Sequence, residues 1–124
     1  MDHSPRVLAL VATVQARVVE VPPTEVAALI SSGEARVFDV REDHEWAAGH
    51  VPGASHLGKG IIERDIERTV PDPATPIVLY CGGGYRSALA VDALQKMGYG
   101  DVRSMSGGWR AWTELGGAIS MDPT

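Results

Sequence analysis

Short runs of apolar and β-branched residues alternate along this chain with segments whose apolar residues recur every three or four positions. The short runs predict strands at residues 17–21, 35–40, 55–57, 77–80 and 101–105. The spaced segments predict helices at residues 22–33, 46–49, 61–70, 87–97 and 109–115. Strands that alternate with helices in this way are typical of an α/β layer fold with a mostly parallel sheet.

The two ends of the chain fit this pattern less well. We expect residues 1–16 to form an N-terminal extension, which is either a tail, an extra helix or a contact between copies. Residues 119–124 are expected to form a C-terminal tail. The apolar stretch at residues 7–14 is too short to span a bilayer and lacks the basic start of a signal peptide. One domain is therefore expected at residues 17–118.

Composition excludes several classes of protein. A chain of 124 residues buries roughly two-thirds of its unfolded surface on folding, so it needs neither a disulfide nor a metal. One cysteine and the absence of zinc-like His/Cys spacing favour a reducing, cytoplasmic location. A net charge of −5 without a long basic run argues against nucleic-acid or membrane partners. No dinucleotide fingerprint is present, and we expect neither a cofactor nor a metal.

Cys81 is the residue with the clearest chemical meaning. It stands between the apolar run 77–80 and three successive glycines at 82–84. The strand would deliver the sulfur, and the glycines would let the backbone curl around it. Amide N–H groups at the start of the next helix, together with Arg86, would then favour the nucleophilic thiolate. A lone cysteine is more often a small buried hydrophobic residue, but the glycines and the C-x4-R spacing favour a reactive thiol.

Four stretches of the chain, in order, resemble the motifs of single-domain rhodaneses, a family of sulfurtransferases. They are Phe38-Asp39-Val40-Arg41-Glu42, Gly49-His50-Val51-Pro52-Gly53-Ala54, Tyr80-Cys81-Gly82-Gly83-Gly84-Tyr85-Arg86-Ser87 and Gly107-Gly108-Trp109. Each motif alone is weak, but the ordered set is specific and spans residues 18–116. The resemblance implies a three-layer α/β/α fold with a five-stranded, mainly parallel sheet flanked by helices. The active loop would follow the fourth strand, where open α/β sheets bind ligands.

The same resemblance implies the chemistry. Cys81 would take a sulfane sulfur from thiosulfate or a persulfide, and pass it through its own persulfide to a thiophilic acceptor such as cyanide or a thiol. The loop residues Gly82, Gly83, Gly84, Tyr85 and Arg86 would cradle the sulfur with backbone N–H groups. The implied partners are small donor and acceptor molecules, or a protein that carries the sulfur.

The side chains near this loop leave alternatives open. Arg86 either directs its charge toward the sulfur or holds the loop through a cap or ion pair. Asp39 is expected to orient loop or arginine groups. Arg41 would either guide an anionic donor or pair with Asp39 or Glu42, and the ion pair is slightly favoured. Tyr85 would shape donor selectivity or pack against Trp109, itself a core or site-wall residue.

This chain departs from family members that use thiosulfate well. Those members carry basic residues directly after the cysteine and an arginine four positions beyond the one matching Arg41. Here the corresponding residues are Gly82, Gly83 and Glu45. Fewer fixed cations would face the donor, which predicts a preference for a bulkier persulfide or a protein persulfide.

Two other functions fit parts of the pattern. Phosphatases and arsenate reductases also place a cysteine and an arginine around an anion-binding loop. The tyrosine-phosphatase type uses C-x5-R to wrap a tetrahedral phosphate, one residue more than separates Cys81 from Arg86. The second rival is a non-catalytic or regulatory interaction module. Such modules commonly lose the cysteine, which this chain keeps.

Overall fold

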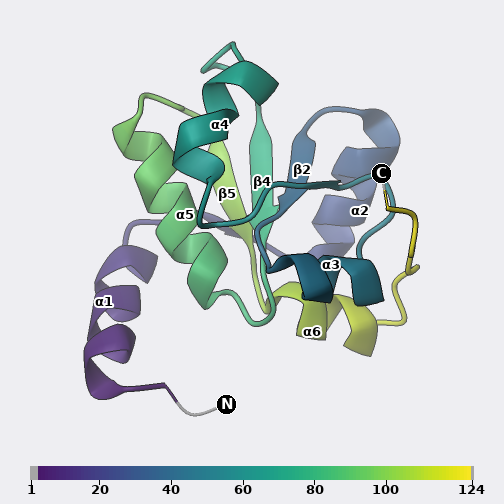
Figure 1. Ribbon diagram of the computed structural model, residues 1–124, viewed down its shortest axis with the longest axis horizontal. Coiled ribbons are helices and arrows are strands. Elements are labelled where there is room, and N and C mark those ends of the chain that lie inside the picture. The colour runs from purple at the N-terminus through teal and green to yellow at the C-terminus, as the bar shows by residue number, and fades with distance from the viewer. Residues whose placement is uncertain (1–2, 124) are drawn as a thin grey trace.

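The computed structural model describes residues 3–123, in which six helices surround one parallel sheet (Figure 1). The strands are β1 (Glu20–Val21), β2 (Arg36–Asp39), β3 (Ser55–His56), β4 (Ile77–Tyr80) and β5 (Val102–Met105). The helices are α1 (Pro5–Gln15), α2 (Pro23–Ser32), α3 (Asp43–Ala48), α4 (Ile62–Thr69), α5 (Tyr85–Lys96) and α6 (Gly108–Glu114). The strands lie in the order β1-β5-β4-β2-β3, and every pairing is parallel. The predicted fold class is confirmed.

Strand β4 lies at the centre of the sheet and is apolar along its whole length. Ile77 and Leu79 belong to one hydrophobic cluster, with Cys81 directly after them, whereas Val78 and Tyr80 belong to the other. Successive side chains of a strand point to opposite faces, and here both faces are covered. The continuous apolar run in the sequence follows from this double burial.

Helices α4 and α5 cover one face of the sheet, with α1 beside α5, while α2, α3 and α6 lie on the other side (Figure 1). On the first side Ile66 of α4 and Leu94 of α5 pack into the core. On the second side Val26 of α2 and Trp46 of α3 do the same. No helix within residues 3–123 is long and apolar enough to cross a membrane.

The N-terminal extension contains a helix that packs on the domain. Val11 and Val14 of α1 are buried, and Val14 joins the core beneath α5. Just past the helix, Arg17 donates to the carboxylate of Asp92 on α5 at 2.9 and 3.1 Å. Residues 1 and 2 and residue 124, parts of the predicted extension and tail, lie outside the described residues.

Three predicted boundaries are wrong by two or more residues, and each has a local cause. The first strand does not begin at residue 17, because Arg17 and Val18 donate their N–H groups to the Val14 carbonyl and complete the last turn of α1. Helix α3 begins at Asp43 instead of residue 46, because Glu42 and Glu45 form a reciprocal capping box. Helix α5 begins at Tyr85 instead of residue 87, directly after the left-handed Gly84.

We expect Leu79→Ala to lower the free energy of unfolding by about 2–5 kcal/mol, because it leaves a cavity in the strand buried on both faces. Leu115→Ala is the matched control, since this leucine is 62% exposed and should change stability by less than about 0.5 kcal/mol. Urea unfolding followed by tryptophan fluorescence measures both. Equal losses in the two variants would contradict the assignment of β4 as the core strand.

Candidate active site

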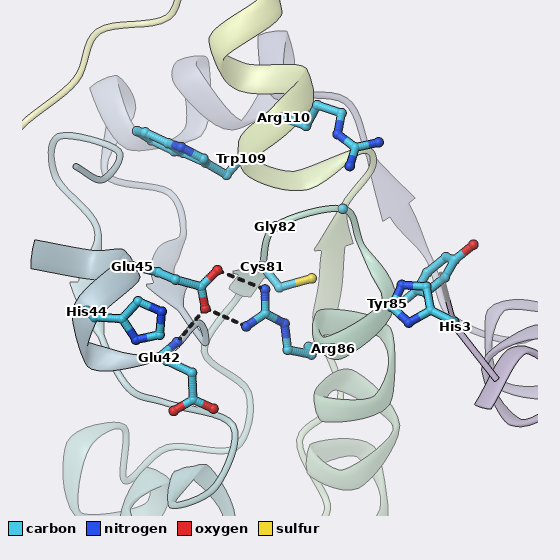
Figure 2. Close-up of a pocket in the computed structure, with 11 residues that line it drawn as sticks. His3, Glu42, His44, Glu45, Cys81, Gly82, Tyr85, Arg86, Trp109 and Arg110 are labelled. Atoms are coloured by element: carbon cyan, nitrogen blue, oxygen red, sulfur yellow. Dashed lines mark hydrogen bonds and ion pairs between the residues drawn. The ribbon is translucent and has the colours of Figure 1, made fainter. Parts of the chain in front are cut away.

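A pocket of about 820 Å³ lies beside the loop that follows β4 (Figure 2). Its walls come from the N-terminal segment, α3, the β4–α5 loop and the start of α6. The lining residues are His3, Glu42, His44, Glu45, Cys81, Gly82, Gly83, Tyr85, Arg86, Trp109 and Arg110. The predicted cysteine and most of its predicted loop therefore line the same pocket.

The sulfur of Cys81 lies at the N-terminus of α5. The residue is only 1% exposed. Its Sγ accepts a hydrogen bond from the Gly84 N–H at 3.1 Å, and the thiol donates to Ser87 Oγ at 3.4 Å. Ser87 Oγ lies 2.8 Å from Ser104 Oγ of β5. The sulfur thus meets a backbone donor and the positive end of a 12-residue helix, both of which stabilise negative charge.

The loop is held from the other side by the start of α6. The Cys81 carbonyl accepts from the Trp109 N–H at 2.7 Å, and the Gly82 carbonyl accepts from the Arg110 N–H at 3.0 Å. A trans peptide directs its C=O and its N–H to opposite sides, so the N–H groups of Gly82 and Gly83 point away from α6. Figure 2 shows the sulfur on that side of the loop. Helix α6 therefore orients the loop's N–H groups toward the sulfur's side.

Gly108 makes this approach possible. A Cβ atom at this position would overlap the carbonyl oxygen of Cys81, and its φ of +55° lies in the left-handed region. Only a residue without a side chain combines that conformation with so close a contact. This backbone contact explains the second glycine of the pair ahead of Trp109, while Gly107, with a φ of +71°, has no room for a Cβ beside Ala111.

Arg86 forms an ion pair with Glu45 across the pocket wall (Figure 2). Its Nη1 and Nη2 donate to the two carboxylate oxygens at 2.6 and 3.1 Å. The Glu42 N–H also donates to Glu45 Oε1 at 3.0 Å. The hydrogen bond from Arg86, followed by that of the backbone, holds the pKa of Glu45 at about 2 against the cost of burial. The ion pair that was one interpretation of Arg86 is present, and Arg86 also lines the pocket that contains Cys81.

Asp39 and Arg41 form a second ion pair, beneath the site. Both side chains are buried, and Arg41 donates to the Asp39 carboxylate at 2.8 to 3.0 Å and to the Gly49 carbonyl at 2.7 Å. The guanidinium lies 4.7 Å from the ring centroid of Trp109. Neither charged residue lines the pocket. The predicted pair exists, and it supports the pocket wall through Trp109.

The sequence model of the rhodanese-like domain matches residues 22–115. The chain belongs to the rhodanese-like domain family. Thiosulfate sulfurtransferase GlpE of Pseudomonas putida is 35% identical over 92 residues, which are 74% of this chain and 82% of that protein. The human thiosulfate:glutathione sulfurtransferase is 31% identical over 105 residues, covering 73% of this chain and 89% of that protein.

A solved structure matches almost the whole rhodanese-like chain. It is a protein of unknown function from Rhodopseudomonas palustris, named as a possible tyrosine phosphatase, with 29% identity and a TM-score of 0.82. The match covers 97% of this chain and 99% of that one. The family and its named relatives show that the chain is an enzyme of the rhodanese type, a sulfurtransferase.

The remaining histidines and aromatic residues of this rhodanese-like domain take structural positions. Tyr85 packs against His3 with 4.8 Å between ring centroids and the rings tilted by 52°, while Trp109 lies on the opposite side of the pocket in Figure 2. His50 is buried and its Nδ1 lies 2.9 Å from the Trp46 carbonyl oxygen, in agreement with its predicted role in fixing a turn. His44, predicted to be solvated, is exposed at the pocket wall.

Several side chains at the site were not singled out by the sequence. Ser87 carries a signal, because it lies at the start of a helix in the loop motif, but Ser104 belongs to a strand with no motif. His3 and Arg110 also lie outside any motif, so the sequence gives no signal for their place at the site. Within residues 3–123 no group of three or more His, Cys, Asp or Glu side chains is arranged to hold a metal ion.

We expect Gly108→Ala to push α6 away from the loop, because the new methyl group and the carbonyl of Cys81 cannot occupy the same space. A displaced loop should lower kcat/KM for sulfur transfer by up to about 100-fold. Gly60→Ala is the control, since its added Cβ meets nothing within 4 Å. Full activity of the Gly108 variant in a steady-state assay would show that α6 does not fix the loop.

The low pKa of Glu45 gives a pH dependence with a defined sign. The pKa falls from an ordinary 4.5 to about 2 on folding, so the ion pair stabilises the folded state fully above about pH 5. This contribution is lost as the pH falls through 2. The difference in free energy of unfolding between wild type and Glu45→Gln should therefore be constant at neutral pH and shrink below about pH 4. Urea unfolding at a series of pH values tests this, and a pH-independent difference would contradict it.

Proposed function

We propose that this protein transfers sulfane sulfur through a persulfide on Cys81. The observation that carries the proposal is the position of the sulfur at the base of the pocket, with the Gly84 N–H and the start of α5 directed at it. A thiolate there attacks the outer sulfur of thiosulfate. The S–S bond of the donor breaks, its electron pair leaves with sulfite, and Cys81 holds the outer sulfur as a persulfide.

The second half-reaction returns the site to its starting state. Cyanide or a thiolate attacks the outer sulfur of the persulfide, and the bond to Cys81 breaks. Cyanide leaves as thiocyanate and a thiolate leaves as a new persulfide, while the electron pair returns to Cys81 as thiolate. The negative charge alternates between two neighbouring sulfur positions, so one set of fixed N–H donors serves both half-reactions.

Ser87 supports the ionised forms of the sulfur. The Cys81 thiol donates to Ser87 Oγ, but a thiolate has no proton to donate and can only accept. The Ser87 hydroxyl, which donates to the Gly84 carbonyl at 3.3 Å when the thiol is protonated, rotates and donates to the sulfur of the thiolate instead, and Ser104 then donates to Ser87. The two buried hydroxyl groups thereby satisfy either protonation state of the thiol without moving heavy atoms.

The donor and the acceptor are proposed from the relatives and from the size of the pocket. The name of the Pseudomonas putida relative supports thiosulfate as a donor, and that of the human relative supports glutathione as an acceptor. A volume of about 820 Å³ is within the range of pockets for drug-sized ligands and suits a peptide thiol. A reducing cytoplasm, in which such thiols are abundant, fits a protein with a single cysteine.

Intact mass after donor treatment tests this function. We expect thiosulfate or a low-molecular-weight persulfide to add one sulfur atom to the wild type, cyanide to remove it, and Cys81→Ser to add none. Circular dichroism checks that the variant is folded. No adduct on a folded wild type from any donor would contradict the proposal, and hydrolysis of an aryl phosphate that depends on Cys81 would favour phosphatase chemistry.

A further inference from the structure

The charged side chains around the pocket cancel one another. Glu42 and Glu45 carry negative charge, and Arg86 and Arg110 carry positive charge. Figure 2 shows Arg110 on α6, across the loop from the sulfur, whereas Arg86 belongs to the first turn of α5, directly after the loop. The Arg86 guanidinium also lies against the loop, since a Cβ on Gly82 would be 3.0 Å from Arg86 Nη2. Arg86 is therefore the cation placed to act on a donor at Cys81.

Glu45 engages Arg86 through both of its terminal nitrogens. The contacts of 2.6 and 3.1 Å join one carboxylate oxygen to each nitrogen. The carboxylate is held in place independently of Arg86, because it also accepts the Glu42 N–H in the capping box of α3. Glu45 stays ionised throughout the neutral range, so the guanidinium is neutralised before any donor arrives.

This pair affects donors according to their charge. Thiosulfate is a compact dianion, so a free guanidinium at the site would strengthen its binding considerably. A fixed carboxylate beside that guanidinium weakens the binding of thiosulfate. A simple alkyl persulfide carries a single negative charge, so the carboxylate weakens its binding less. We propose that Glu45 is a specificity-determining residue that disfavours thiosulfate relative to singly charged persulfides by holding Arg86 in an ion pair. This inference rests on the proposed function.

Glu45→Gln tests the inference with little change in structure. Glutamine retains the length of the side chain and can complete the capping box, but it removes the negative charge. Asp43→Asn is the matched control, because it removes one charge from the same helix while its side chain is exposed and does not line the pocket. The donors are thiosulfate and 2-hydroxyethyl persulfide, and the readout is the rate of sulfur addition to Cys81 at varied donor concentration.

We expect Glu45→Gln to lower the half-saturating concentration of thiosulfate by roughly five-fold, with a smaller change for the persulfide. The maximal loading rate should change less than the half-saturating concentration. Asp43→Asn should leave the ratio of the two donors unchanged. In an Arg86→Gln background, Glu45→Gln should have a smaller effect on thiosulfate, because it then removes only the direct repulsion by the carboxylate and releases no guanidinium to the donor.

Three results would overturn the inference. They are an unchanged donor ratio in Glu45→Gln, an equal shift in Asp43→Asn, and an undiminished effect of Glu45→Gln in the Arg86→Gln background. Failure of the proposed function is distinguishable from these, because the wild type itself would then take no sulfur on Cys81 from either donor.

Discussion

The close approach of α6 to the β4–α5 loop is the constraint on which the site depends. Two carbonyl groups of the loop, at Cys81 and Gly82, are fixed by N–H groups from the start of α6. Because a peptide group is planar, fixing its carbonyl also fixes the N–H on its other side. The backbone part of the sulfur cradle is therefore a consequence of packing between two backbone segments, which the absence of a side chain at Gly108 permits.

The two ion pairs near the site differ in environment. Asp39 and Arg41 are buried, so each would carry an uncompensated charge if the other were absent, and their pairing holds the end of β2 in one arrangement. Glu45 and Arg86 retain contact with solvent, with 26% and 36% of their side chains exposed, so their mutual attraction is screened and contributes modestly to stability. Their position at the pocket gives this second pair its chemical importance. The first pair supports the wall, and the second sets the charge that a ligand meets.

The sequence was sufficient for the fold because the strongest local signals agreed with the global arrangement. The apolar run at Ile77–Tyr80 indicates a strand buried on both faces, and the glycines after it indicate a tight loop around Cys81. The sequence did not predict which residue pairs with Arg86. Glu45 precedes it by 41 residues and lies on another helix, so their contact depends on the fold bringing residues of α3 and the start of α5 to the same pocket. Ser104 likewise reaches Ser87 only through the pairing of β5 with β4.

The order of strands in the sheet has a consequence for how the protein is made. Strand β1 pairs only with β5, and β2 pairs with β4, so the early strands have no central partner until later parts of the chain exist. A ribosome that has released residues up to β3 has released β1, β2 and β3 without the strands β4 and β5 that join them into one sheet. Non-local pairing of this kind slows folding and prolongs exposure of apolar strands. The N–H groups of α6 emerge after all five strands, so a nascent chain acquires its sulfur cradle only once the whole sheet has been made.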